Sequence, residues 1–189
     1  MQIKFTTVTC PQDITDILAL QAANHISITD EATRSAQGFV TVRHDPDVLA
    51  RMNMAYPSII ARANDELAGY ALMMPRSFRK DIPILEPMFT RLDSLSWRDA
   101  PLTDQKWFVM GQICVNEKYR GQGVFDGLYQ HLQSVWQSHF DFVITEVSER
   151  NPRSMRAHER VGFEVLYAYT NDVTGEGWRV IVLDFGKKR

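Results

Sequence analysis

The distribution of apolar residues along the chain predicts alternating strands and helices. Residues 2–8 alternate Ile3, Phe5 and Val8 with polar neighbours, as in a half-buried strand. Asp13 can cap the helix that follows, whose apolar residues recur at helical spacing to about residue 23. The chain is therefore expected to open with a strand and an amphipathic helix.

The next stretch is irregular until it reaches a clear pair of apolar runs. Helical segments are indicated near residues 30–39 and 45–55, on either side of a break marked by Gly and Pro. Residues 57–62 and 66–73 flank turn-like residues and predict a hairpin. Four prolines and many large apolar residues then mark 75–105 as an ordered insertion with a short helix.

The second half of the chain has a more regular pattern. A core strand is expected at 106–115, followed by a glycine-containing loop and a helix whose apolar stripe runs from Val124 to Trp136. The elements expected after it are a strand at 142–147, a helix opened by Asn151-Pro152 and ended by Gly162, and two strands at 163–169 and 178–185.

The composition is that of a folded globular protein, with 44% hydrophobic and 23% charged residues. A length of 189 residues fits one domain, residues 1–189. The net charge of −2 gives no general attraction to nucleic acid or to an anionic membrane. No signal peptide or membrane span is recognisable, and the two cysteines match no disulfide framework. We therefore expect a cytoplasmic protein with neither nucleic acid nor membrane as a partner.

The most specific candidate site is the segment Tyr119-Arg120-Gly121-Gln122-Gly123-Val124, between the core strand and the helix. Glycines let a backbone approach a phosphate, and the helix N-terminus favours its negative charge. Arg120 adds a charge-assisted donor. The segment lacks the Gly-Lys-Ser/Thr of a Walker A loop and the three glycines of a Rossmann fingerprint, so nucleoside triphosphates and NAD rank low. Two glycines before a helix also occur in simple turns, so the context must decide.

The segment resembles the coenzyme A loop of the GCN5-related N-acetyltransferases, the GNAT superfamily, whose pattern is Arg/Gln-x-x-Gly-x-Gly/Ala. Arg120 and Gly123 match this pattern, and Phe125 stands at its final small-residue position. We expect the Phe125 ring to turn into the apolar stripe of the helix, while its backbone N–H remains a donor.

A second segment further along the chain also resembles this family. There a strand ends, an Asn opens a helix, a small residue follows three positions later, and Gly-Phe closes the helix. Asn151, Ser154, Gly162 and Phe163 fit these positions. Two motifs in the right order, each on the expected junction, support one another.

The resemblance implies a fold, a co-substrate and a binding site. The fold is α/β (α+β), with a mixed, mostly antiparallel central sheet of about seven strands and helices on both faces. The co-substrate is acetyl-CoA, and no metal is expected because no His, Cys or carboxylate group has metal-ligand spacing. The implied coenzyme A residues are Ile113, Cys114, Val115, Arg120, Gly121, Gln122, Gly123, Val124, Phe125, Asn151 and Ser154.

Two residues are candidates for proton transfer. An attacking amine must lose a proton, and its pKa lies near 8 for an α-amine or 10.4 for a lysine. Glu146, five residues before Asn151, resembles the glutamate proposed as base in the ribosomal-protein alanine acetyltransferases of the family. His158 takes the place of the tyrosine often proposed to protonate the departing thiolate. Structural roles for both stay open, and the alternative proton donors are Tyr129, Tyr167 and Tyr169.

The acceptor is the least constrained part of the prediction. The family usually builds the acceptor site from the segments that correspond to residues 24–38 and 171–178. Their carboxylates, which can attract an amine or be solvated loop charges, are Asp30, Glu31, Asp172 and Glu176. The insertion can cover the acceptor or form a homodimer surface. Three functions stay open: acetylation of a primary amine on a small metabolite by direct attack in a ternary complex, acetylation of a protein or peptide, and non-catalytic sensing of acyl-CoA.

Overall fold

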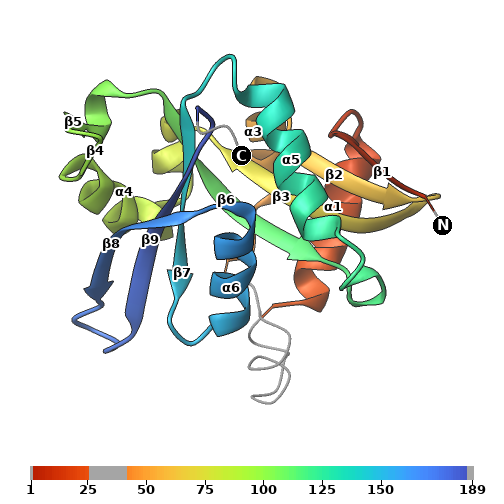
Figure 1. The fold of residues 1–189 in the computed structure, drawn as a ribbon. Helices are drawn as coiled ribbons and strands as arrows, with labels where there is room; N and C mark the ends of the chain where they lie inside the picture. Colours follow the sequence, from red (N-terminus) through yellow and green to blue (C-terminus); the bar gives the residue numbers. More distant parts are fainter. Residues whose placement is uncertain (1, 26–41, 187–189) are drawn as a thin grey trace.

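The computed structural model of the protein describes residues 2–25 and 42–186 (Figure 1). Its main strands are β1 (Ile3–Thr7), β2 (Ile59–Ala63), β3 (Glu66–Met74), β6 (Trp107–Val115), β7 (Phe142–Ser148), β8 (Glu164–Thr170) and β9 (Gly177–Asp184). Its α-helices are α1 (Pro11–Ala23), α3 (Pro46–Ala55), α4 (Glu86–Asp93), α5 (Val124–Trp136) and α6 (Pro152–Val161). The helix expected near residues 30–39 lies outside the described residues.

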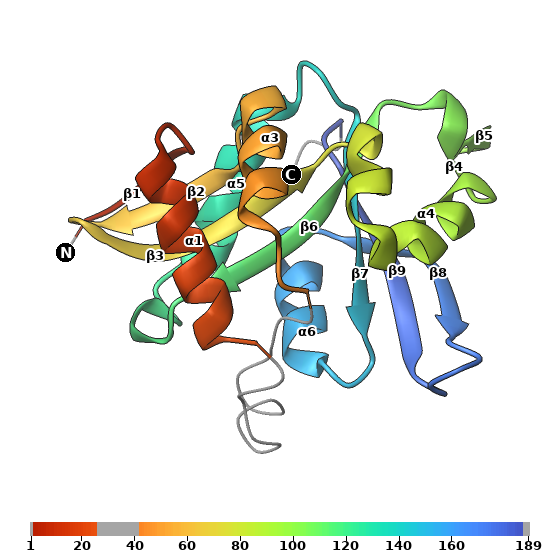
Figure 2. The same cartoon turned by 180° about the vertical axis from the view of Figure 1, so that it is seen from behind.

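The main strands form one seven-stranded sheet in the order β1-β2-β3-β6-β7-β9-β8. Every neighbouring pair is antiparallel except β6 and β7, which are parallel. Helices α1, α3 and α4 cover one face, and α5 and α6 cover the other (Figures 1 and 2). The predicted mixed, mostly antiparallel sheet with helices on both faces is therefore confirmed, whereas the single domain stays a prediction.

The insertion at 75–105 is an ordered part of the α4 face. It contains α4 and a small hairpin of β4 (Ser96–Trp97) and β5 (Ala100–Pro101). Phe89 and Leu92 of α4 are fully buried in a cluster that also contains Ile144 of β7. Burying such side chains stabilises a fold by about 1.5–3 kcal/mol each. The insertion is thereby fixed against the centre of the sheet.

Strands β6 and β7, in the middle of the sheet, separate towards one end of it. Leu72 pairs with Gln112 and Met73 pairs with Met110, so Gly111 is the extra residue of a β-bulge in β6. The parallel pairing of β6 with β7 ends at Val109 and Ile144, and the strands diverge beyond these residues (Figure 1). The backbone at Ile113–Val115 therefore has no partner strand on the β7 side among the residues that the structure describes.

Helix α5 crosses the sheet closely because Gly127 leaves room for Phe5. A Cβ atom built on Gly127 would lie 2.1 Å from Cζ of Phe5. We expect Gly127→Leu to lower the free energy of unfolding by roughly 2 kcal/mol, because overpacking costs about 1–3 kcal/mol. Urea denaturation measures this loss. In a Phe5→Ala background the same substitution should cost less than half as much, and an equal cost in both backgrounds would contradict the steric explanation.

Candidate active site

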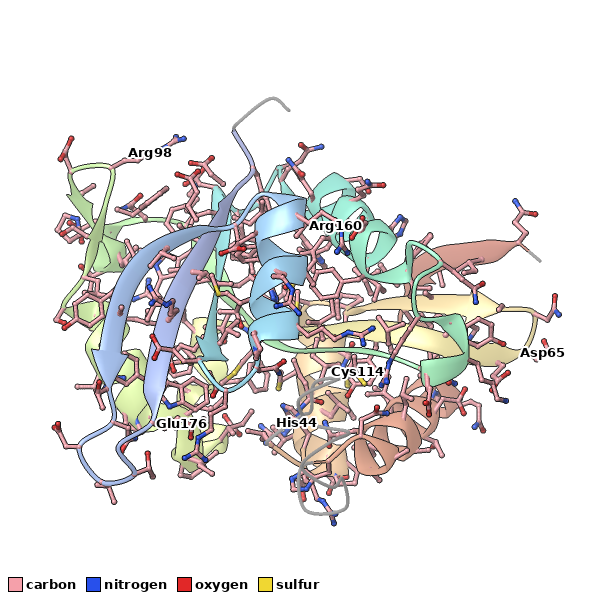
Figure 3. The ribbon with its side chains drawn as sticks, turned by 60° about the horizontal axis from the view of Figure 1, so that its bottom comes forward. His44, Asp65, Arg98, Cys114, Arg160 and Glu176 are labelled. Atoms are coloured by element: carbon pink, nitrogen blue, oxygen red, sulfur yellow. The ribbon has the colours of Figure 1, made fainter. Side chains whose placement is uncertain are left out.

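A cavity of about 480 Å³ lies between the end of β6, the glycine loop and the first turns of α5 and α6. The predicted coenzyme A residues line it, with the exception of Gln122, whose side chain donates to the carbonyl oxygen of Lys118 at 2.9 Å. Further lining residues, absent from the predicted set, are Asn24, Tyr119, Asp126, Arg153, Arg156, Ala157 and Arg160. Segments far apart in sequence therefore converge on one cavity. Figure 3 labels two of its lining residues, Cys114 of β6 and Arg160 of α6.

The glycine loop needs its two glycines for backbone conformation. Gly121 and Gly123 have φ angles of +75° and +77°, in the left-handed region that strains residues with a Cβ atom. Gly123 directly precedes the first residue of α5. A Cβ on either glycine would meet no atom within 4 Å, so it would point into free space beside the cavity. The first N–H groups of a helix have no acceptor inside the helix, which makes this end of α5 suitable for an anion.

Hydrogen bonds to β6 and to the C-cap residue of α1 hold Arg120 at the cavity. Its Nε donates to the carbonyl oxygen of Val115 at 3.2 Å, and its Nη2 donates to Oδ1 of Asn24 at 2.7 Å. Burial lowers the pKa of Arg120, but a guanidinium stays protonated near neutral pH. The cavity therefore contains a fixed positive charge beside the loop.

Helix α6 adds a row of three arginines that the sequence analysis missed. Arg153, Arg156 and Arg160 are three and four residues apart, so they share one helical face, and all three line the cavity. Arg160 is also paired with Asp126 of α5, with Nη2 and Oδ1 2.6 Å apart. This spacing was a readable signal in the sequence. The cavity is consequently rich in positive charge, which suits a ligand with several phosphate groups.

Phe125 contributes both to the core and to the cavity. Its ring centroid lies 5.2 Å from that of Tyr129 and 5.1 Å from that of His158. It packs against the α5 and α6 core while also lining the cavity. The bulky residue is thus turned towards the apolar stripe, as expected, and adds an aromatic wall.

His158 points into the core between α5 and α6 and does not line the cavity. It is 2% exposed, and its Nδ1 lies 2.8 Å from the carbonyl oxygen of Ser154. Because a carbonyl only accepts, Nδ1 must carry the proton, and Nε2 then accepts from the Tyr129 hydroxyl at 2.9 Å. Burial lowers the pKa of His158 to about 4. The structure offers no geometric support for its predicted role as an acid, and that role stays a prediction.

A buried polar network joins α1 to the bulge of β6. Oε1 of Gln112 accepts from Gln21 at 2.7 Å and from the Tyr70 hydroxyl at 2.6 Å. Gln21 also lies 2.8 Å from Nδ1 of His44, and burial lowers the pKa of His44 to about 4. This network holds the backbone next to Gly111, at the point where β6 leaves β7.

The two buried histidines make stability depend on acid. Each has a folded pKa of about 4, below the ordinary value of 6.5, so the unfolded state binds more protons. The contribution of these neutral histidines to the free energy of unfolding is fully present above pH 6.5, and it is lost as the pH falls towards 4. The free energy of unfolding should fall as the pH is lowered from 6.5 to 4. In His158→Gln, which lacks the titrating group, we expect this fall to be smaller by roughly 2–3 kcal/mol. Urea titrations across this range measure the slope, and an unchanged slope would contradict a neutral His158.

Glu146 lies on β7, two residues beyond the last pair with β6 and on the α4 face of the sheet. Its side chain is only 11% exposed, so Glu146 does not face the solvent. Oε2 accepts from the Tyr169 hydroxyl at 3.0 Å, whereas Oε1 is buried without a hydrogen-bond partner among the described residues. Burial raises the pKa of Glu146, and Tyr169 and Arg91 partly offset this effect. A buried carboxylate with one free oxygen can act as a base.

The described residues include only part of the predicted acceptor segments. Asn24 lines the cavity, but Asp30 and Glu31 lie outside the described residues. Glu176, in the loop between β8 and β9 (Figure 3), accepts a hydrogen bond from the hydroxyl of Ser148 at the end of β7. Of the alternative tyrosines, Tyr169 contacts Glu146, Tyr129 contacts His158, and Tyr167 is exposed.

The described residues show neither a metal cluster nor a membrane-spanning helix. Within 2–25 and 42–186, no group of three or more His, Cys, Asp or Glu residues could hold a metal ion. None of the helices in the same part of the chain has both the length and the apolar character needed to span a bilayer. The absence of a metal cofactor and the cytoplasmic location stay predictions.

Solved structures of acetyltransferases share the fold of this chain. No curated protein sequence matches the chain. The ribosomal-protein-S18-alanine N-acetyltransferase from Escherichia coli is 13% identical, with a TM-score of 0.62 over 100% of this chain and 97% of that chain. The putative acetyltransferase yncA from Salmonella typhimurium, solved with its cofactor acetyl-CoA, has the same identity, score and coverage. The NatC complex bound to Gag peptide and CoA is 15% identical, with a TM-score of 0.63 over 97% and 99% of the two chains.

These structural similarities show the fold, whereas a match to the sequence profile of a family shows membership of that family. The profile of the Acetyltransferase (GNAT) family matches residues 25–163, which include β6, the glycine loop and α6. This match confirms the resemblance seen in the two sequence motifs. The chain belongs to the Acetyltransferase (GNAT) family.

Proposed function

We propose that the protein transfers an acetyl group from acetyl-CoA to the primary amine of a small metabolite. The observation that carries this proposal is the cavity, in which the end of β6 that has diverged from β7, a left-handed glycine loop and four arginines converge. Its volume of about 480 Å³ is within the usual range for small-molecule sites. We further propose that residues 1–189 form one domain.

The donor set fits coenzyme A. The start of α5 and Arg120 suit a pyrophosphate, because helix N–H groups and a guanidinium both favour oxyanions. Arg153 and Arg156 lie on the same positively charged wall, next to Asn151 and Ser154. The apolar surfaces of Ile113, Val115, Val124 and Phe125 suit the uncharged arm of the cofactor.

The proposed chemistry divides between the two faces of the sheet. When bound, acetyl-CoA supplies the thioester carbon that the amine attacks, and the C–S bond breaks to give an amide and a thiol. Glu146 takes the ammonium proton on Oε1, directly or through water, so that the nitrogen lone pair becomes available. A backbone N–H from Ile113–Val115 can stabilise the thioester oxygen, because in the described part of the chain β6 pairs there with β3 and not with β7. The opening between β6 and β7 would connect the two faces.

A small acceptor is favoured over a peptide by the insertion. Arg91 of α4 lies over the Tyr169 ring, with its guanidinium carbon 3.4 Å from the ring centroid. The insertion therefore covers Glu146 from one side, where an extended peptide would need room.

Two measurements test the proposed function. Calorimetric titration should show binding of acetyl-CoA, and a panel of small amines, amino acids and short peptides should then reveal thiol release with at least one amine. Release only with peptides would replace the proposed acceptor by a peptide N-terminus. Binding without release across the whole panel would indicate an acyl-CoA sensor, and absence of binding would refute the cavity assignment.

A further inference from the structure

The insertion brings a cation to the candidate base. Nη1 of Arg91 lies 3.8 Å from Oε1 of Glu146, and the Arg91 guanidinium stacks on the Tyr169 ring. The Tyr169 hydroxyl donates to the other carboxylate oxygen, Oε2, at 3.0 Å. Three side chains from α4, β7 and β8 therefore form one cluster, which we call the Glu146 cluster.

The two carboxylate oxygens of Glu146 differ in their hydrogen bonding. Oε2 is occupied by the Tyr169 hydroxyl, which fixes the rotation of the carboxylate. Arg91 is close enough to attract the negative charge, but 3.8 Å is too long for a hydrogen bond to Oε1. No donor among residues 2–25 and 42–186 reaches Oε1, and a buried oxygen without a donor is unfavourable, so Oε1 is the position where a water or an acceptor ammonium would bind.

The position of Arg91 is set by the packing of the insertion. The neighbouring residues Phe89 and Leu92 are buried against the sheet. Arg79 holds both ends of α4, with Nε 3.1 Å from Oε2 of Glu86 and Nη1 2.7 Å from Oδ2 of Asp93. The Arg91 side chain is 28% exposed, so its charge is partly screened by solvent but directed by a rigid helix.

We propose that Arg91 and Tyr169 are positioning residues for Glu146, and that the insertion at 75–105 thereby completes the acceptor half of the active site. Tyr169 orients the carboxylate, and Arg91 keeps it ionised while leaving Oε1 free. This inference rests on the proposed function, because it assigns partners to the proposed base. Neither residue would touch the reacting atoms.

The charges around the cluster support this division. From α4 the group facing Glu146 is Arg91, from β8 it is Tyr169, and from the β8–β9 loop Glu176 acts on Tyr169. Burial raises the pKa of Glu146, whereas Arg91 and Tyr169 lower it. Burial and the Glu146 charge raise the pKa of Tyr169, so the hydroxyl keeps its proton and remains a donor at neutral pH.

The test is the pH dependence of kcat/KM for the acceptor identified in the amine panel. An opposite charge at this distance lowers a carboxyl pKa by about 1–3 units, and partial exposure favours the lower figure. We expect Arg91→Met to move the acidic limb up by about one unit. The rate would then fall about tenfold at pH values below the limb and change little at high pH, while Arg91→Lys keeps most of the rate. Acetyl-CoA affinity should change less than twofold.

Arg76→Met is the matched control, because Arg76 belongs to the same insertion but pairs with Asp93 at 3.7 Å and stacks on Trp107. Its acidic limb should coincide with that of the unmodified protein. An unmoved limb in Arg91→Met, or an equal loss of rate at every pH, would overturn the proposal in favour of a purely structural role. Tyr169→Phe should lower kcat with little change in acceptor KM. An unaltered kcat would show that Tyr169 does not position Glu146.

A measurement without turnover separates this inference from the proposed function. The side-chain carboxyl carbon of Glu146 can be followed by ¹³C NMR during a pH titration, and its resonance is assigned by its loss in Glu146→Gln. We expect Arg91→Met to raise this titration midpoint by about one unit. A raised midpoint in a protein that releases no thiol with any amine would leave the Glu146 cluster intact and refute the proposed function. An unchanged midpoint in an active enzyme would overturn the role of Arg91 and leave the proposed function in place.

Discussion

Replacing Glu146 by glutamine is expected to lower kcat by roughly 100- to 10,000-fold, the usual contribution of a general base. The amide has nearly the same shape and can still accept from Tyr169, but it cannot take a proton from an ammonium. Affinity for acetyl-CoA should be unchanged, because Glu146 does not line the cavity. Steady-state thiol release with the identified amine, together with calorimetric titration of acetyl-CoA, measures both quantities.

The pH dependence gives this prediction a second readout. Burial raises the pKa of Glu146 above its ordinary value, so the unmodified enzyme should show an acidic limb that Glu146→Gln lacks. The deficit of the variant should shrink as pH approaches the pKa of the acceptor amine, because the free amine then needs no base.

Glu149→Gln provides a matched control for the loss of a carboxylate near the end of β7. The Glu149 side chain is 50% exposed and pairs with Arg179, with Oε1 and Nη2 3.1 Å apart. We expect the turnover of this variant to stay within about twofold of the unmodified enzyme, as for a surface ion pair. Equal activity of Glu146→Gln and Glu149→Gln would exclude Glu146 as the base.

The order of the elements could be predicted from the sequence because each carries its own local signal. Apolar periodicity indicated the strands and helices, and Gly121, Gly123 and Gly162 marked their junctions. The helix after the first strand differed in detail: it begins at Pro11 with Cys10 as its N-cap, and Asp13, inside the first turn, accepts from the N–H of Cys10 at 3.2 Å. Local chemistry was thus sufficient for the order, although not for every boundary.

The candidate site was only partly predictable because it depends on how elements rotate and meet. The sequence did contain a signal for the buried His158, since Met155, His158 and Val161 recur every three residues on the inner face of α6. The arginines occupy the opposite face, which became meaningful only once α6 was seen beside the loop. No local pattern could connect Arg91 with Glu146, because their contact depends on the packing of the insertion.

The glycine loop gives the second large expected effect. Replacing Gly123 by valine should weaken acetyl-CoA binding by roughly 100-fold, equivalent to about 3 kcal/mol. A residue with a branched Cβ is strained at φ +77°, so the loop would shift and its N–H groups would lose their alignment. The added methyl groups would also occupy free space beside the cavity that a phosphate would need. Calorimetric titration with acetyl-CoA and with desulfo-CoA measures the loss.

Gly175→Val separates this effect from the general cost of a strained residue. Gly175 has φ +68°, and a Cβ there would also meet no atom within 4 Å, but the residue lies in the β8–β9 loop and does not line the cavity. Both variants should therefore lose similar stability, about 1–2 kcal/mol, while only Gly123→Val loses affinity. Unchanged affinity in Gly123→Val would refute phosphate binding by the loop. Equal losses of affinity in both variants would mean that strain acts through the whole fold, because the two glycines share their conformation and differ in their place relative to the cavity.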